Sequence, residues 1–438
     1  MNAVIAIAVY AAVFALIYRG TVDRSWAVLG GGAVMMLYGV ADGFYPLSAA
    51  LGAIYFETLA LIFGMSLVSS LLARSGFFTH MAARTVAASL GNGWWVLVVL
   101  TLTTYAISLF VNNLTTIVIV LPLTLTACRQ MRLNPVPLTI AEIVASNLGG
   151  ASTMIGDFPN MIIASAGKLA FMDFIGGMMA PCLVLLAAFL VFFNWARPAL
   201  RIGGDGSRLD IGEAEAVLAA GVGNPRLASV GLWLLGLTLL GFLLSDALHL
   251  RPSWIALIAG SLALLLGEFR EDELPAACGV SDILFFTGLF VMVGGLVAAG
   301  VGEALLGFVE AASGGHDLLR LLVLMWLSAF VTIFLNAGPT AALFVPVAAA
   351  THMALGDPTV WWALSLGVLA GSSADLTGAT AGTVAATHLE RFMRDHPEMS
   401  AVTWPRTGLS FKGYLRWGLP VMTMFLVLSS LYIIVVAG

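Results

Sequence analysis

The chain has 438 residues, of which 60% are hydrophobic and only 10% are charged, with a formal net charge of −5 and a mean hydropathy of +1.00. Soluble domains carry about a quarter charged residues, so this composition excludes a soluble globular protein and gives no basic surface for nucleic acid. At ~20 residues per span, the length allows roughly ten membrane crossings. We therefore predict an all-α polytopic membrane protein, embedded in a lipid bilayer.

Apolar runs predict the elements of the first half. In chain order they are spans at 3–18, 25–47 and 56–73, an interfacial helix at 76–93, a re-entrant hairpin at 94–127, a broken span at 137–167, an amphipathic piece at 168–173 and a span at 174–196. The hairpin is predicted because the polar stretch Val111–Thr116 divides its apolar run into two short arms.

The broken span contains the most unusual stretch, Ser146–Ser165, which reads SNLGGASTMIGDFPNMIIAS. Its glycines, its proline and Asp157 predict a helix that stops at membrane depth, exposes backbone groups and restarts at Asp157–Pro159. Such irregular backbone is tolerated in a membrane only where it lines a cavity or a site.

A second half follows the polar linker at 197–228. Its predicted elements are spans at 229–248, 253–267 and 282–299, an interfacial helix at 301–316, a hairpin at 318–352, a broken span at 359–386, a polar segment at 387–412 and a last span at 413–437. We divide the chain into a first membrane repeat (1–196), a cytoplasmic linker (197–228) and a second membrane repeat (229–438).

Individual residues recur at nearly the same spacing. The pairs spaced by 224 or 222 residues are Asn112 with Asn336, Pro122 with Pro346, Gly149 with Gly371, and Gly156 with Gly378. Each half is predicted to hold five crossings and a hairpin. Because five is odd, the second half enters the membrane with the opposite orientation, so the repeats are expected to be inverted.

Basic residues indicate the orientation. With the N-terminus outside, all but three of the 19 basic residues fall in inside segments, which include the linker and 387–412; the exceptions are Lys168, Arg251 and Arg320. Cytoplasmic segments of membrane proteins are rich in Lys and Arg. We therefore expect the cytoplasmic membrane of a bacterial type of cell, the inner membrane.

The motif Ser146-Asn147-Leu148-Gly149-Gly150, followed by Ile155-Gly156-Asp157-Phe158-Pro159-Asn160 and preceded by an Asn-Thr-Thr hairpin that ends in Leu121-Pro122, resembles the ion transporter superfamily. The nearest branch is that of the arsenite permeases (ArsB) and NhaD-type permeases, and the sodium-coupled dicarboxylate symporters are more distant. Phe158 stands where family members usually have a second proline. The resemblance implies an elevator-like or rocking secondary transporter, often a homodimer, with its site between two hairpins and two broken helices.

Polar side chains gather at the predicted breaks. Candidate ligands at the hairpin tips and on the broken spans are Asn112, Asn113, Thr115, Ser146, Asn147, Ser152, Thr153, Asn160, Asn336, Thr340, Ser372, Ser373 and Thr377. Half-helices add backbone N–H groups that suit anions and carbonyls that suit cations. Asn113, Asn147 and Asp157 are the candidate ligands for Na⁺. The alternative is that such residues cap helices and join spans.

Three acidic residues are candidates for proton coupling. Asp157 and Asp375 lie at membrane depth, where a charge is costly and usually functional, and no Lys or Arg falls in the predicted core to pair with them. Asp157 could equally be the N-cap of the helix that follows it. The repeat spacing aligns Asp375 with Thr153, so the site is expected to be asymmetric. Glu142 could carry protons or lie at the interface.

We expect a secondary transporter, most simply an H⁺-coupled antiporter that exports Na⁺ or, as the resemblance suggests, arsenite or antimonite. The alternative is a Na⁺-coupled symporter of a small dicarboxylate or sulfate. An enzyme is disfavoured, because His-Glu-x-x-His and Gly-x-Ser-x-Gly are absent, and the three cysteines and six histidines show no metal spacing. No cofactor is expected beyond Na⁺ or H⁺ as the coupling ion.

Overall fold

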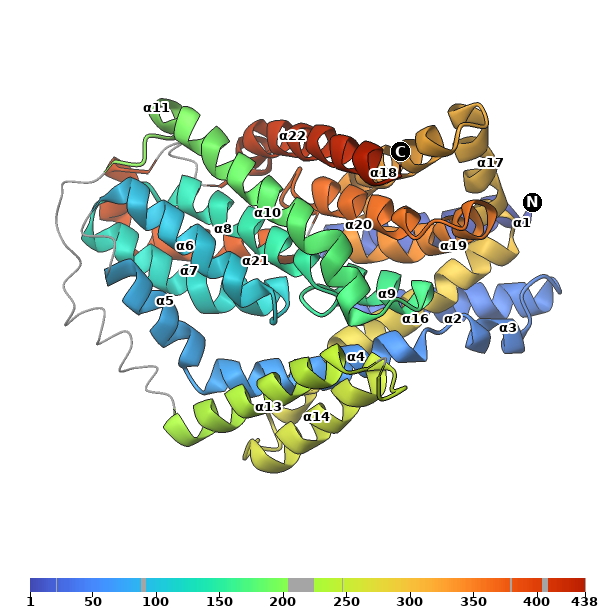
Figure 1. The fold of residues 1–438 in the computed structure, drawn as a ribbon, viewed down its shortest axis with the longest axis horizontal. Coiled ribbons are helices and arrows are strands. Elements are labelled where there is room, and N and C mark those ends of the chain that lie inside the picture. Colours follow the sequence, from blue (N-terminus) through green and yellow to red (C-terminus); the bar gives the residue numbers. More distant parts are fainter. Residues whose placement is uncertain are drawn as a thin grey trace.

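The computed structural model describes residues 1–20, 22–87, 92–203, 224–245, 247–378, 380–403 and 409–437. In these ranges the regular elements are helices, with one isolated bridge between Leu133 and Gly203. Figure 1 shows the helices gathered into one bundle, with α4, α13 and α14 along one edge. The predicted all-helical class is confirmed.

The first half contains eleven helices among the described residues. They are α1 (Asn2–Arg19), α2 (Arg24–Ala41), α3 (Leu47–Gly52), α4 (Phe56–Arg74), α5 (Phe77–Ala87), α6 (Gly93–Ser108), α7 (Asn113–Gln130), α8 (Pro135–Ser152), α9 (Phe158–Gly167), α10 (Phe171–Trp195) and α11 (Arg197–Leu200). The hairpin is thus α6 and α7, and the broken span is α8 and α9.

The second half repeats this order of long helices. Its elements are α13 (Pro225–Leu243), α14 (Pro252–Leu266), α15 (Leu274–Ala277), α16 (Val280–Ala298), α17 (Val301–Ser313), α18 (Asp317–Leu335), α19 (Ala337–Leu355), α20 (Thr359–Ser372), α21 (Thr380–Asp395), the 3₁₀ helix η1 (Pro397–Ala401) and α22 (Phe411–Ala437). The second hairpin is α18 and α19, and the second broken span is α20 and α21.

Seven of the described helices are long and apolar enough to cross a membrane: α4, α10, α13, α16, α18, α19 and α22. Apolar helices of 10–17 residues add α14 and α20, together with α6 and Asn2–Ile17 of α1. Many large apolar side chains point outward, among them Leu265 and Val435 at 79% and 80% exposed. Outward apolar surface on this scale suits lipid contact, so the protein is an integral membrane protein.

The two halves interlock through reciprocal helix pairs. The second span of each half packs on the third span of the other, as α2 on α16 and α14 on α4. Gly64 and Gly260 make this contact close, because a side chain at Gly64 would meet the backbone of Ala256, and one at Gly260 would meet Gly64 itself. Small residues allow membrane helices to approach in this way.

The second helix of each hairpin packs on the restarted half-helix of the other half, as α7 on α21 and α19 on α9. Within each half, the first helix of the hairpin packs on the first helix of the broken span, as α6 on α8 and α18 on α20. Glycines make these contacts close, because a Cβ at Gly149 would meet the carbonyl of Tyr105, and a Cβ at Gly371 would meet that of Ala329. These are the glycines that the repeat spacing aligned. The inverted orientation of the halves across a bilayer stays a prediction, as do the domain boundaries.

Two segments differ from the predictions. The amphipathic piece at 168–173 does not exist as a separate element, because α10 already begins at Phe171. The second broken span extends to Asp395, well into the segment predicted as polar connection. Helix α21 alternates buried and exposed positions, so an average of hydropathy misses it. Residues 204–223 of the linker lie outside the described residues.

Candidate functional site

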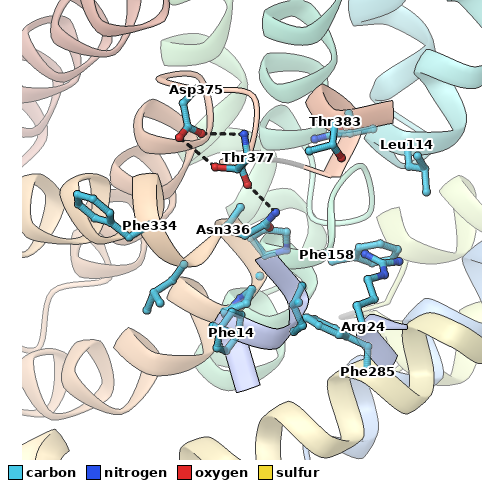
Figure 2. Close-up of a pocket in the computed structure, with 18 of the residues that line it drawn as sticks. Phe14, Arg24, Leu114, Phe158, Phe285, Phe334, Asn336, Asp375, Thr377 and Thr383 are labelled. Carbon is cyan, nitrogen blue, oxygen red and sulfur yellow. Dashed lines mark hydrogen bonds between the residues drawn. The ribbon is translucent and has the colours of Figure 1, made fainter. Parts of the chain in front are cut away.

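A cavity of about 740 Å³ opens where the hairpin tips, the broken spans and the first helices of the chain meet (Figure 2). Its polar lining is Arg24, Asn113, Asp157, Asn336, Asp375, Thr377 and Thr383. Its apolar lining includes Phe14, Phe158, Phe285, Phe286 and Phe334. The cavity therefore combines side chains from both halves of the chain.

Asn113 is the centre of the first polar cluster. Its Nδ2 donates to Asp157 Oδ2 at 2.9 Å and to Asn147 Oδ1 at 3.1 Å, and its Oδ1 accepts from Ser108 Oγ at 3.0 Å. Asn113 stands at the first turn of α7 directly after the hairpin tip, and Asn147 stands on α8. The hairpin and the broken span are thereby joined through one amide.

Asp157 serves as a helix cap and as a site residue. Its Oδ1 accepts from the backbone N–H of Phe158 at 2.9 Å, at the start of α9, while its Oδ2 holds Asn113. A carboxylate at a helix N-terminus is favoured by the helix dipole. The N-cap interpretation is therefore compatible with a functional one, since each role uses a different oxygen.

Two further amides fasten this cluster to the other half. Asn147 Nδ2 donates to the carbonyl of Ser372 at 3.1 Å, and Ser365 Oγ donates to Asn160 Oδ1 at 2.7 Å. Asn160 Nδ2 in turn donates to the carbonyls of Gly150 and Thr153, at the end of α8 and in the break that follows it. These bonds hold the two broken spans together at their breaks.

Asp375 organises the second cluster. Its Oδ1 accepts from the backbone N–H of Thr377 at 2.9 Å and of Gly378 at 2.5 Å, and its Oδ2 accepts from Thr377 Oγ1 at 3.0 Å. Asn336 at the tip of the second hairpin donates to the carbonyl of Thr377 at 3.0 Å (Figure 2). Among the described residues, Asp375 has no hydrogen bond from a side-chain amide, whereas Asp157 has one from Asn113.

The predicted alignment of Asp375 with Thr153 has a structural counterpart. Thr153 Oγ1 accepts from the N–H of Gly156 at 3.1 Å, as Asp375 Oδ1 accepts from the N–H of Gly378. The same turn is therefore closed by a hydroxyl in one half and by a carboxylate in the other. Asp375 therefore brings a carboxyl group to the cavity, whereas the equivalent position in the first half, Thr153, has a hydroxyl.

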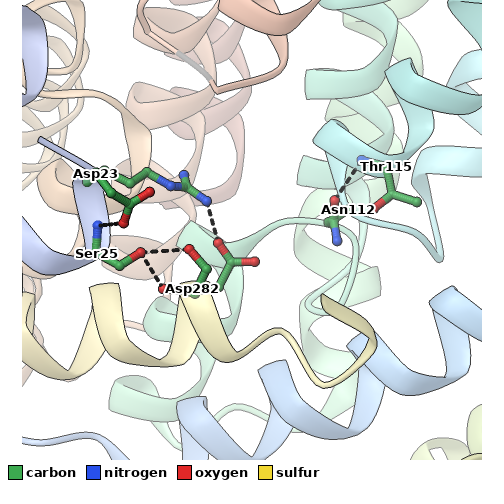
Figure 3. Close-up of polar contacts among 7 residues, drawn as sticks. Asp23, Ser25, Asn112, Thr115 and Asp282 are labelled. Atoms are coloured by element: carbon green, nitrogen blue, oxygen red, sulfur yellow. Dashed lines mark hydrogen bonds and ion pairs between the residues drawn. The ribbon is translucent and has the colours of Figure 1, made fainter. Parts of the chain in front are cut away.

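Arg24 is a cavity residue that the sequence reasoning missed, and Asp282 is its ion-pair partner. Arg24, which we expected in an inside loop, lines the cavity and pairs with Asp282 at 2.5 Å, and Ser25 Oγ donates to the carbonyl of Ser281 at 2.8 Å beside them (Figure 3). Arg24 thus shares the cavity with Asp157 and Asp375, but among the described residues its ion pair is with Asp282 and not with either of them. The sequence did hold a hint of this ion pair, because opposite charges stand at the starts of two apolar spans, Arg24 in the first half and Asp282 in the second.

Several predicted ligands instead serve the helices that carry them. Hydroxyls that bond to carbonyls three or four residues back on their own helix belong to Ser146, Ser152, Thr340, Ser372 and Ser373. Asn112 caps α7 by accepting from the N–H of Thr115 at 2.9 Å (Figure 3). None of these seven residues lines the cavity.

Glu142 lies apart from the cavity, between α7 and α8. It is fully buried, Thr124 Oγ1 donates to its Oε1, and its Oε2 has no hydrogen-bond partner among the described residues. Whether Glu142 carries protons or lies at the membrane interface stays a prediction.

The described residues contain no group of three or more His, Cys, Asp or Glu side chains that could hold a metal ion. The first cluster offers a cation mixed oxygens, namely the carboxylate of Asp157 and the amide oxygen of Asn147. Carboxylate and amide oxygens are hard ligands, which suit Na⁺ or a proton rather than a soft metal.

Comparison with known proteins places the chain in a family. A profile described as a citrate transporter (CitMHS) matches residues 12–367. The chain is similar to the magnetosome protein MamN of Magnetospirillum gryphiswaldense, with 47% identity over 99% of both chains, and to the uncharacterized transporter Rv2685 of Mycobacterium tuberculosis, with 32% identity over 98% of both.

Among solved structures it resembles the YdaH transporter of Alcanivorax borkumensis, with a TM-score of 0.56 and 16% identity over 91% of this chain and 88% of that one, a likeness of fold alone. The family profile and the relatives together confirm the predicted resemblance to the ion transporter superfamily. The chain therefore belongs to the CitMHS citrate transporter family of membrane transporters.

Proposed function

We propose that this protein is an ion-coupled secondary transporter in which Asp157, with Asn113 and Asn147, holds the coupling cation. The observation that supports it is the position of the Asn113 amide nitrogen, 2.9 Å from Asp157 Oδ2 and 3.1 Å from Asn147 Oδ1. A donor that bridges two oxygens in this way occupies the place that a cation would take. When the cation binds, the Asn113 side chain turns over, so that its Oδ1 joins the oxygens of Asp157 and Asn147 as a ligand.

Proton coupling follows from the same carboxylate. Asp157 loses its proton when Na⁺ binds and regains one when Na⁺ leaves. The Asp157 carboxyl group therefore holds either one proton or one sodium ion at a time. Asp375 is the second proton-coupling candidate, because it lines the same cavity and is charged where its counterpart is Thr153. The exchange of H⁺ for Na⁺ is therefore the first candidate function.

Charge in the cavity supports a cationic cargo. Arg24 is the only Lys or Arg among the described lining residues, and Asp282 already pairs with it, whereas Asp157 and Asp375 have no such partner. Two carboxylates that line one cavity attract cations and repel a dianion. The net field of the cavity favours Na⁺ over an oxyanion.

A second candidate is Na⁺-coupled uptake of a small di- or tricarboxylate. Two observations favour it: the family profile is described as a citrate transporter, and Arg24 lines the cavity. Guanidinium groups bind carboxylates through two parallel hydrogen bonds. In this case bound sodium ions offset Asp157 and Asp375, and the carboxylate replaces Asp282 at Arg24.

The orientation is proposed from the distribution of basic residues, with the N-terminus outside and residues 197–228 and 387–412 in the cytoplasm of a bacterial-type cell. Homodimerisation is proposed from the family resemblance. Labelling single cysteines in the two polar segments with an impermeant reagent, on intact cells and on inverted vesicles, tests the first. Mass photometry of the detergent-purified protein tests the second.

The function is tested in proteoliposomes that contain a pH-sensitive dye. Na⁺, citrate, succinate, sulfate and arsenite are added one at a time against an imposed pH gradient. Proton movement that saturates with Na⁺ alone supports the antiporter. Na⁺-dependent uptake of labelled citrate or succinate supports the symporter instead. Flux that follows each solute's own gradient without saturation would reject both coupled mechanisms.

A further inference from the structure

A second, smaller pocket of about 270 Å³ lies among α4, α9 and the start of α14, where the two halves of the chain meet. Its basic lining is Lys168, His249 and Arg251, and the acidic residue among the described lining is Glu57. Arg251 pairs with Glu57, whereas Lys168 makes no ion pair with a described residue. The pocket therefore carries an excess of positive charge, and the cation site proposed above uses none of its residues.

The charges of this pocket stand at the ends of helices. Glu57 lies in the first turn of α4, Lys168 directly follows α9, and Arg251 directly precedes α14. In the predicted orientation, Lys168 and Arg251 are two of the three basic residues that fall outside, against the general bias of the chain. Because two of these exceptions meet in one pocket, we expect them to serve a local purpose there.

The start of α14 lacks the cap that its counterpart in the first half has. Asp23 caps α2, where its Oδ1 accepts from the N–H of Ser25 at 2.9 Å. Arg251 occupies the cap position of α14, and no described side chain caps that helix. The N-terminus of a helix is its positive end, which an anion stabilises and a cation does not. A bound anion would give α14 what Asp23 gives α2.

A hydroxyl group without a partner belongs to the same wall. Ser165 lines the pocket, and its Oγ is buried without a hydrogen-bond partner among the described residues. Leaving a buried hydroxyl unpaired costs free energy, so a ligand that accepts a hydrogen bond from it is favoured. Ser253, in the first turn of α14, lines the pocket as well. The pocket thus offers hydroxyl donors beside its basic groups.

This set of donors is the one that proteins use for phosphate. Ammonium, guanidinium and hydroxyl groups and a helix N-terminus can approach a tetrahedral oxyanion from several directions at once. Carboxylates are planar and use fewer such directions. The pocket volume of about 270 Å³ is several times the ~30 Å³ of one water molecule in the liquid, so a phosphate group has room.

The surface beside the pocket is apolar. Leu250 lines the pocket and is exposed, and its chain neighbours Leu248 and Trp254 are exposed as well. Tryptophan is frequent at the level of the lipid headgroups, where helix ends also lie. A phosphate group in the pocket would therefore have a surface for acyl chains beside it.

We propose that the pocket lined by Lys168, Ser165, His249 and Arg251 binds a phosphate group, carried by an anionic phospholipid or by a soluble phosphate. The basic side chains and Ser165 Oγ donate to its oxygens, and the start of α14 supplies the positive end of a helix. Because α4 and α9 belong to the first half and α14 to the second, the bound phosphate joins the two halves and stabilises the fold.

Thermal unfolding of the delipidated full-length protein in detergent tests the site. Phosphatidylglycerol, phosphatidylcholine, inorganic phosphate or citrate is added, and each protein is compared with itself without the addition, so intrinsic changes in stability cancel. Phosphatidylglycerol or inorganic phosphate should raise the Tm of the wild type. Lys168→Gln should increase the concentration needed for half of that rise by about 10-fold or more, and Ser165→Ala should increase it too. Lys168→Arg should respond as the wild type does.

Lys412→Gln is the matched control, since it removes the same charge from α22, outside the pocket. It should leave the response unchanged. A rise that requires Lys168 with phosphatidylglycerol but not with inorganic phosphate assigns the site to a lipid, and the same rise with inorganic phosphate assigns it to a soluble phosphate. Native mass spectrometry should show a bound phosphatidylglycerol in the first case, retained by Lys412→Gln and lost from Lys168→Gln.

Two results would overturn the proposal. One is an equal response of the wild type and Lys168→Gln, including no response by either. The other is a rise that requires Lys168 with citrate alone, because the pocket would then bind a carboxylate. Asp157→Asn should respond to the phosphate probes as the wild type does, so the phosphate site and the proposed cation site fail separately.

Discussion

The Asn113 side chain donates from its Nδ2 to Asp157 Oδ2 at 2.9 Å, and this bond joins the tip of the first hairpin to the start of α9. Asn112, the preceding residue, instead caps α7 through its side-chain oxygen. Neighbouring asparagines thus have separate roles, which gives a matched pair of variants for the cation site.

Asn113→Ala removes one ligand oxygen and should weaken binding of the coupling cation by about 10- to 100-fold, since polar contacts with a charged group contribute about 1.5–3 kcal/mol. Asn112→Ala should instead lower the free energy of unfolding by about 1 kcal/mol through loss of the cap and leave cation affinity unchanged. Isothermal titration with Na⁺ and thermal unfolding in detergent measure the two effects. Equal cation affinities in the two variants would remove Asn113 from the site.

Gly150 has no room for a side chain, because a Cβ there would meet Asn113 Oδ1 and, at 3.0 Å, the Cβ of Asp157. Gly150→Ala should therefore displace the Asn113–Asp157 pair and reduce coupled transport at least about 10-fold, the effect of about 1.4 kcal/mol. Gly176→Ala on α10 is the control, since a Cβ there meets nothing within 4 Å. Transport by Gly150→Ala that matches the control would mean that the pair is not needed.

The breaks in the chain were predictable because their residue types are rare at membrane depth. Asn112 precedes α7, and Asp157 precedes α9, whose first turn holds Pro159, so these residues mark helix starts; Gly149 instead lies within α8. The physical constraint is local, so the sequence alone carries it. The repeat spacing likewise aligned Thr153 with Asp375, and the two side chains close the same turn.

The rest of the site depends on packing that no local pattern encodes. Arg24 lines the cavity only because α2 packs on α16 of the other half. Hydroxyls such as Ser146 and Ser372 have the chemistry of ligands, yet each is bonded to a carbonyl of its own helix. Whether a hydroxyl faces its own helix or a cavity is decided by rotamer and neighbours, which residue type does not reveal.

The Arg24–Asp282 pair can be probed by neutralising one member at a time. Arg24→Gln leaves the cavity more negative and should lower the KM for Na⁺, whereas Asp282→Asn leaves it more positive and should raise that KM, each by about 5-fold for ~1 kcal/mol of Coulomb energy. Initial rates of Na⁺ uptake measure this. If both variants shift the KM in the same direction and lower the Tm together, the pair only fastens α2 to α16.

Glu142 is the third candidate for proton coupling, and its burial, with no partner for Oε2 among the described residues, supports that role. Glu142→Gln keeps the shape and the bond from Thr124 but carries no exchangeable acid proton, so Na⁺ uptake should lose its dependence on an imposed pH gradient. Thr124→Val removes the donor and keeps the acid, and should retain that dependence. Wild-type coupling in Glu142→Gln would assign Glu142 a packing role.

The most direct measurement is Na⁺/H⁺ exchange by Asp157→Asn in proteoliposomes, beside the wild type and Asp375→Asn, with folding checked by size-exclusion chromatography. Asparagine still accepts from the Phe158 N–H and so keeps the cap, but it holds neither a proton nor a negative charge. The account predicts that the Asp157→Asn protein is folded and gives no Na⁺-dependent proton movement. Exchange at the wild-type rate by that folded variant would contradict it and leave Asp157 as a helix cap.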